Sequence, residues 1–146
     1  MASSGDQYDL DRFLRAQAAD YNRALSELRE GEKRSHWMWF TFPQIEGLGQ
    51  SAMSRRYSIK SAAEARAYLD HPVLGPRLRE CATVVLNIVG RSAFEVFGSP
   101  DDLKLRSCAT LFARVSDDAV FQEILDKYFD GQCDNETLRL LDAAMG

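Results

Sequence analysis

The chain has 146 residues, 45% of them hydrophobic and 27% charged, which are ordinary values for one globular domain. It contains no apolar run near the ~20 residues that cross a bilayer and no basic, then apolar leader. We therefore expect a cytoplasmic protein that neither binds membranes nor carries a cofactor. Its three cysteines, Cys81, Cys108 and Cys133, are odd in number and widely spaced, which predicts free thiols.

The formal net charge of -4 is unevenly distributed along the chain. Residues 33–60 sum to +4, whereas residues 95–146 sum to -6. General nucleic-acid binding requires a basic face that neutralises many phosphates, so an acidic chain of this kind is a poor candidate for it. A small anion requires far fewer positive charges, and only the 33–60 segment supplies them.

The first predicted helix runs from about Asp9 to Glu30, because apolar residues recur there every three or four positions. Gly31 follows at the position where a left-handed residue ends a helix. The Ala18–Asp20 stretch is a point at which this helix could divide. Next comes an aromatic turn over Ser35–Phe40 and then the longest predicted loop, residues 43–54.

The middle of the chain carries clear helix boundaries. Ser61 and Glu64 form a capping-box pattern, and the helix that they open should end at His71, before a proline. A longer helix is predicted from Gly75 to Gly90. Ser92 and Glu95 then open a short helix by the same capping pattern.

The carboxyl-terminal part is predicted to form three more helices. Ser99 is the expected N-cap of the first, with Pro100 at its first helical position and acidic residues in the first turn. The second begins at Asp117 and stops at Gly131, and the third is capped by Asp134 or Asn135 and runs to Met145.

No segment shows sustained period-two alternation, so the predicted fold is all-α: a compact, irregular multihelical bundle forming a single domain. We expect residues 1–7 to be a flexible tail and residues 8–146 to form the domain. Much of the core is predicted to come from Trp37, Phe40, Leu78, Leu86, Leu111, Phe112, Phe121 and Leu125.

Four stretches carry a resemblance to a known family: "KRSHWMWFTFPQIEGLGQS", "EARAYLDHPVLGPRLREC", "FGSPDDLKLRSCATLF" and "DKYFDGQCDNETL". In this order they resemble the hallmark blocks of the domain-of-unknown-function family 1810, from about Asp9 to Leu141. The resemblance implies an all-α multihelical domain without an established reaction, in a family that sometimes carries a calpastatin-like name. Cys108 stands where the family more often has serine, which argues against a catalytic thiol.

The candidate site lies in the 33–60 segment, which combines net positive charge, loop glycines, a histidine and a surplus of aromatic surface. The large side chains of the aromatic turn point to all sides, so most of them are expected in the core, with one aromatic edge left for a flat ligand. Neither histidine has cysteines or acids at metal-ligand spacing, so no metal site is predicted. The predicted ligand-binding residues are Lys33, His36, Trp39, Gln44, Gly47, Gly49 and Arg55.

Two functions fit these residues. The first is a domain that binds a small anionic ligand, nucleotide-like or phosphorylated, at the SHWMWFTFPQIEGLG segment; any catalysis would use His36 or Gln44. The second is a non-catalytic interaction module, in which the aromatic segment is entirely core and the uneven charge guides a protein partner or self-association. Lys104 and Ser107, three residues apart, share one helix face that would belong to the site if it met the aromatic loop.

Overall fold

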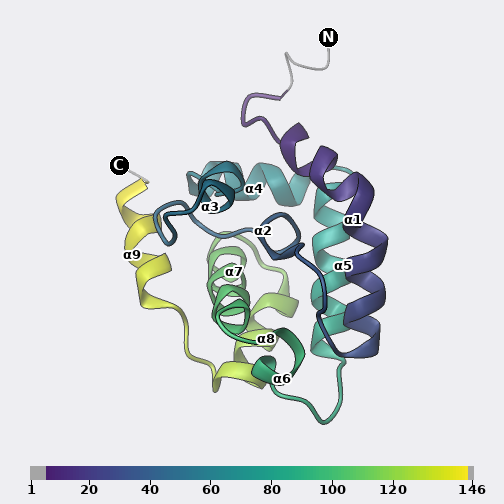
Figure 1. The fold of residues 1–146 in the computed structure, drawn as a ribbon. Coiled ribbons are helices and arrows are strands. Elements are labelled where there is room, and N and C mark those ends of the chain that lie inside the picture. Colours follow the sequence, from purple (N-terminus) through teal and green to yellow (C-terminus); the bar gives the residue numbers. More distant parts are fainter. Residues whose placement is uncertain (1–5, 145–146) are drawn as a thin grey trace.

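Helices make up most of the computed structural model, which describes residues 6–144 (Figure 1). Their bounds are α1 (Asp11–Glu30), α2 (Met38–Thr41), α3 (Ala52–Arg56), α4 (Ala62–Asp70), α5 (Leu74–Leu86), α6 (Ala93–Phe97), α7 (Asp101–Val115), α8 (Ala119–Phe129) and α9 (Asn135–Ala144). The all-α, single-domain prediction is confirmed. Most of the tail predicted at residues 1–7 lies outside the described residues. None of the described helices is both long and apolar enough to cross a membrane.

Helix α1 is continuous, so the predicted division at Ala18–Asp20 is wrong. Alanine is the strongest helix former, and neither glycine nor proline interrupts this stretch. The helix ends as predicted at Gly31, whose φ of 78° lets its amide bond the carbonyls of Glu27 and Leu28. α1 lies along α5, and α7 passes through the middle of the molecule (Figure 1).

The connection between α4 and α5 brings the two helices closer together than the sequence pattern predicts. The Ser61 hydroxyl accepts a hydrogen bond from the Glu64 amide, and α4 ends before His71, both as predicted. α5 begins at Leu74 and ends at Leu86, four residues short of the predicted Gly90. A Cβ atom on Gly75 would lie 2.0 Å from the carbonyl oxygen of Leu69, so only glycine fits where the two helices meet.

The capping patterns locate the later helices to within two residues. Ser92 and Glu95 form the predicted capping box of α6. The cap of α7 is Pro100, so the prediction of Ser99 as its cap is wrong; the Ser99–Pro100 peptide bond is cis, and the helix starts one residue later than expected. α9 is capped as predicted, because the Asp134 carboxylate accepts a hydrogen bond of 3.1 Å from the Thr137 amide.

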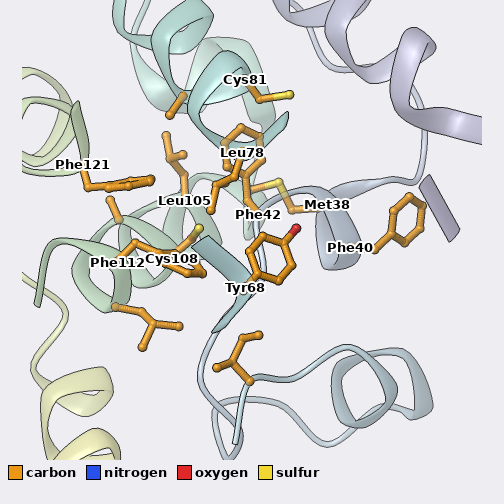
Figure 2. Packing of buried hydrophobic residues seen from close by; sticks show 14 of the residues in the cluster. Met38, Phe40, Phe42, Tyr68, Leu78, Cys81, Leu105, Cys108, Phe112 and Phe121 are labelled. Carbon is orange, nitrogen blue, oxygen red and sulfur yellow. The ribbon is translucent and has the colours of Figure 1, made fainter. Parts of the chain in front are cut away.

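A chain of aromatic contacts runs through the core and joins four helices, and Figure 2 shows its members Tyr68, Phe112 and Phe121. Phe13 of α1 meets Tyr68 of α4 edge-on with ring centroids 5.0 Å apart, Tyr68 meets Phe112 of α7 at 5.7 Å, and Phe112 meets Phe121 of α8 at 5.5 Å. Each fully buried apolar side chain contributes ~1.5 to 3 kcal/mol relative to its exposed state. All of the predicted core residues are buried except Leu86, which is partly exposed.

Residues 46–58 form an excursion whose two ends are tied together. Ile45 and Ile59 form an isolated parallel bridge: the Glu46 amide donates to the Ile59 carbonyl and the Ile59 amide to the Gln44 carbonyl, both at 2.8 Å. Within residues 6–144 no further strand pairing extends this bridge into a sheet. The short helix α3 lies inside the excursion.

Candidate functional site

A hollow of about 280 Å³ opens between the aromatic segment and the first two turns of α7, and we refer to it as the Trp39 hollow. Its lining residues are Trp39, Gln44, Leu48, Gly49, Pro100, Leu103, Lys104, Ser107 and Asp134. They come from α2, from the loop after it, from α7 and from the connection between α8 and α9. The face of Lys104 and Ser107 therefore does meet the aromatic loop.

Gln44 supplies an unpaired buried amide at this hollow. Its backbone carbonyl is fixed by the bond from Ile59, the residue is 8% exposed, and its Nε2 has no hydrogen-bond partner among the described residues. Buried polar groups are nearly always paired, and an unpaired one costs ~1 to 3 kcal/mol. The same amide also borders a narrow hole of about 10 Å³ beside Tyr57 and Ser58.

Two lysines and one aspartate set the charge at this site. The Lys104 ammonium lies 4.0 Å from the centroid of the Trp39 ring and 2.9 Å from Oδ1 of Asp101. Oδ2 of Asp101 lies 2.9 Å from the ammonium of Lys33, which in turn lies over Trp37. Burial raises the pKa of Asp101, but hydrogen bonds from Lys33 and Lys104 outweigh it and lower that pKa. Two cations thus share one carboxylate.

Asp134, unlike the two lysines, offers a hydrogen-bond acceptor, and neighbouring residues hold it in place. Its Oδ2 accepts hydrogen bonds from the Ser107 hydroxyl at 3.2 Å and from both the amide and the hydroxyl of Thr137. Its backbone amide donates to Thr110 at 2.9 Å. Its Oδ1 has an ion-pair contact of 3.6 Å with Arg106. The carboxylate is therefore fixed in place where it lines the Trp39 hollow.

The structure brings together three of the seven predicted site residues: Trp39, Gln44 and Gly49 line the hollow. Lys33 lies one ion pair behind it, through Asp101. Gly47 borders the narrow hole, with Leu140 packed against it. His36 and Arg55 are exposed and are not among the lining residues.

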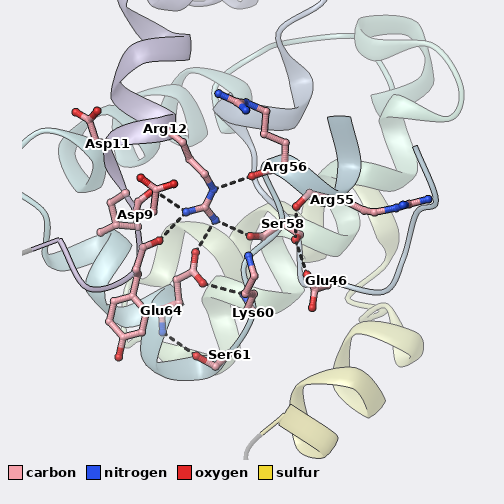
Figure 3. Close-up of polar contacts among 12 residues, drawn as sticks. Asp9, Asp11, Arg12, Glu46, Arg55, Arg56, Ser58, Lys60, Ser61 and Glu64 are labelled. Atoms are coloured by element: carbon pink, nitrogen blue, oxygen red, sulfur yellow. Dashed lines mark hydrogen bonds and ion pairs between the residues drawn. The ribbon is translucent and has the colours of Figure 1, made fainter. Parts of the chain in front are cut away.

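Arg55 instead borders a separate, open groove of about 620 Å³ around the start of α1 (Figure 3). The base of this groove is the buried guanidinium of Arg12, which makes hydrogen bonds of 2.6 to 2.8 Å. The acceptors are the carbonyls of Tyr8, Asp9, Arg56 and Ser58 and the carboxylate of Glu64. Arg12 is thus fully occupied in joining three segments, and the Arg55 side chain points away from it (Figure 3).

The core interpretation holds for most of the aromatic segment. Trp37, Phe40 and Phe42 are buried, and the Trp37 indole nitrogen donates to Glu27 at 2.9 Å. Trp39 is the exception, because it is only partly buried and lines the hollow. Among residues 6–144 no group of three or more His, Cys, Asp or Glu side chains could hold a metal ion.

Sequence reasoning did not place Asp134, Leu48, Pro100 or Leu103 at the site. Asp134 carries a clear signal only as a helix cap, which it is. The other three are ordinary loop and helix residues in the sequence. Their meeting depends on tertiary contacts between parts of the chain that no local pattern links.

Comparison with known proteins identifies one family and one similar solved structure. The family model described as "Protein of unknown function (DUF1810)" matches residues 7–141. The crystal structure of the conserved hypothetical protein Rv1873 from Mycobacterium tuberculosis is 53% identical in sequence, with a TM-score of 0.93. The match covers 94% of this chain and 99% of the other. Among proteins with curated descriptions, none matches the chain.

Proposed function

The chain belongs to the DUF1810 family of proteins of unknown function, and we propose that it binds a small anionic ligand, nucleotide-like or phosphorylated, in the Trp39 hollow. The single observation that carries this proposal is the unpaired, buried amide of Gln44. A ligand atom that accepts its hydrogen bond would remove this cost.

The surrounding groups suit an anion with a flat part. The Lys104 ammonium supplies positive charge, and within the described residues the amides of Leu48 and Gly49, which line the hollow, donate no hydrogen bond. These amides are free to donate to anionic oxygens, as loop amides commonly do. Stacking on the Trp39 ring would add ~1 to 3 kcal/mol for a base or another flat group.

A thermal-shift screen of nucleotides and phosphorylated metabolites tests the proposal. A ligand at 100 times its dissociation constant stabilises the folded state by about 2.7 kcal/mol. Trp39→Ala and Gln44→Met should each weaken the binding of any hit at least about fivefold, since each removes a contact worth ~1 kcal/mol or more. His36→Ala, in the same segment but outside the hollow, is the matched control and should bind as the wild type does.

Gln44→Met also separates a binding role from a structural one. Because the amide is unpaired in the free protein, methionine should leave stability unchanged or raise it by up to about 2 kcal/mol. If this variant is instead clearly less stable and binds normally, the amide bonds solvent in the narrow hole, and the interaction-module alternative is favoured.

A further inference from the structure

We infer that Asp134 selects ligands that carry sugar-type hydroxyl groups in addition to their anionic group. This inference rests on the proposed function and narrows its ligand to a hydroxylated organic phosphate. Its basis is that Asp134 and Ser107 place hydrogen-bond acceptors on one side of the Trp39 hollow. Binding of an anion alone would leave these acceptors without a partner.

The two carboxylate oxygens of Asp134 are not equivalent. Oδ2 accepts from both donors of Thr137, which cap α9, and shares the single Ser107 proton with the Leu103 carbonyl. Oδ1 accepts no hydrogen bond from any residue in the 6–144 range, since its contact with Arg106 is an ion pair of 3.6 Å. One acceptor of a rigid carboxylate is therefore free to bind a ligand donor.

The charge beside Asp134 favours a neutral donor. The Arg106 guanidinium lies 3.6 Å from Oδ1 and offsets the carboxylate charge, so a ligand ammonium would have to displace or face another cation. A hydroxyl group has no such conflict. Ser107 adds a second contact, because its oxygen, whose single proton can point to Asp134 or to the Leu103 carbonyl, retains lone pairs for a ligand hydroxyl. Carboxylates bind sugar hydroxyls in this way in dinucleotide-binding folds.

The hollow thus offers complementary groups: donors at Gln44 and Lys104 for the anion, an aromatic face at Trp39, and acceptors at Asp134 and Ser107. A ligand with only a ring and a phosphate would leave the acceptors unused. A phosphorylated sugar, with or without a base, would use both sets.

The test compares the binding of three probes to the full chain: AMP, 2′,3′-dideoxy-AMP and phenyl phosphate. Binding is measured by the quenching of tryptophan fluorescence, and the Trp39→Phe variant gives the background signal. The wild type should bind AMP about tenfold or more tightly than the dideoxy compound, the usual value of a hydrogen bond to a charged group. In Asp134→Asn this preference should fall several-fold: asparagine also caps helices, but with its oxygen on Thr137 its NH₂ offers a ligand hydroxyl only a neutral hydrogen bond, which is weaker than one to a carboxylate.

Glu136→Gln, an exposed neighbour on α9, is the control and should keep the wild-type preference. Equal binding of AMP and dideoxy-AMP, or of AMP and phenyl phosphate, would overturn the role of Asp134 while leaving the proposed function intact. Loss of the AMP preference in the control as well would assign the effect to α9 stability and also overturn the inference. If AMP, dideoxy-AMP and phenyl phosphate all fail to bind at millimolar concentration, both proposals fall together.

Discussion

Glu27 shows how one buried side chain shapes the entry to the aromatic segment. Its carboxylate accepts hydrogen bonds from the amides of Arg34 and Ser35 at 2.7 and 3.0 Å, from the Ser35 hydroxyl at 2.6 Å and from the Trp37 indole at 2.9 Å. Burial raises the pKa of Glu27, but these hydrogen bonds, chiefly that of the Ser35 hydroxyl, outweigh it and lower the pKa to about 2.

This shift predicts a stability change in acid. The pKa of glutamate in an unfolded chain is ~4.3, so the ionised Glu27 stabilises the folded state above that pH, and this stabilisation is lost as the pH falls toward 2. Glu27→Gln should therefore be less stable than the wild type at pH 7, and the difference should shrink between about pH 5 and pH 2. Urea denaturation across this range measures it.

The exposed Glu123→Gln variant serves as the control and should track the wild type at every pH. A constant difference between Glu27→Gln and the wild type from pH 7 to pH 2 would contradict the prediction, because it would mean that the titration of Glu27 is not linked to folding.

Packing between helices sets the reactivity of the three free thiols. Burial in α5 raises the pKa of Cys81 to about 12, and burial in α7 raises that of Cys108 well above its ordinary value. The thiolate is the reactive form, so both are protected. Cys133, in the connection before α9, is only partly buried.

We therefore expect a disulfide reagent at pH 8 to modify one thiol of the native protein rapidly and the other two only on unfolding. Cys133→Ser should remove the rapid phase and leave the slow one. Rapid modification of Cys81 or Cys108, identified by mass spectrometry, would show that α5 or α7 opens locally.

At the scale of single helices, local sequence patterns predict that a helix forms better than they predict where it ends. Caps with a side-chain acceptor, such as Ser61, Ser92 and Asp134, are placed correctly because the capping bond involves neighbours only three residues apart. The end of α5 at Leu86 is missed, because the apolar stripe continues to Val89 although that side chain is 89% exposed. Apolar periodicity cannot distinguish a buried turn from an exposed one.

Across the whole molecule, the aromatic chain from Phe13 through Tyr68 and Phe112 to Phe121 links helices from both halves of the sequence. We expect cooperative unfolding as one unit, with superimposable urea transitions for helix content by circular dichroism and for Trp37 burial by fluorescence. An earlier loss of the fluorescence signal would instead make the aromatic segment a separately unfolding unit.

The Trp39 hollow is formed by parts of the chain that are distant in sequence, which explains why the sequence predicts only part of it. Trp39, Gln44 and Gly49 stand out because aromatic surplus and loop glycines are local signals. Asp134 lies far along the chain and reaches the hollow only because α9 packs on α7. His36 and Arg55 have suitable chemistry, but the backbone directs their side chains elsewhere, and side-chain direction is not encoded in residue type.

The bridge between Ile45 and Ile59 has a consequence for how such a molecule can diversify. Because the bridge ties the two ends of the excursion together, and Tyr57 near the second end packs into the core against Phe13 and Phe40, the interior between them can vary without opening the framework. Leu48 and Gly49, which form one wall of the hollow, lie in that interior. Insertions and substitutions in that interior should therefore change the shape that the hollow offers to a ligand and leave the helical framework unchanged.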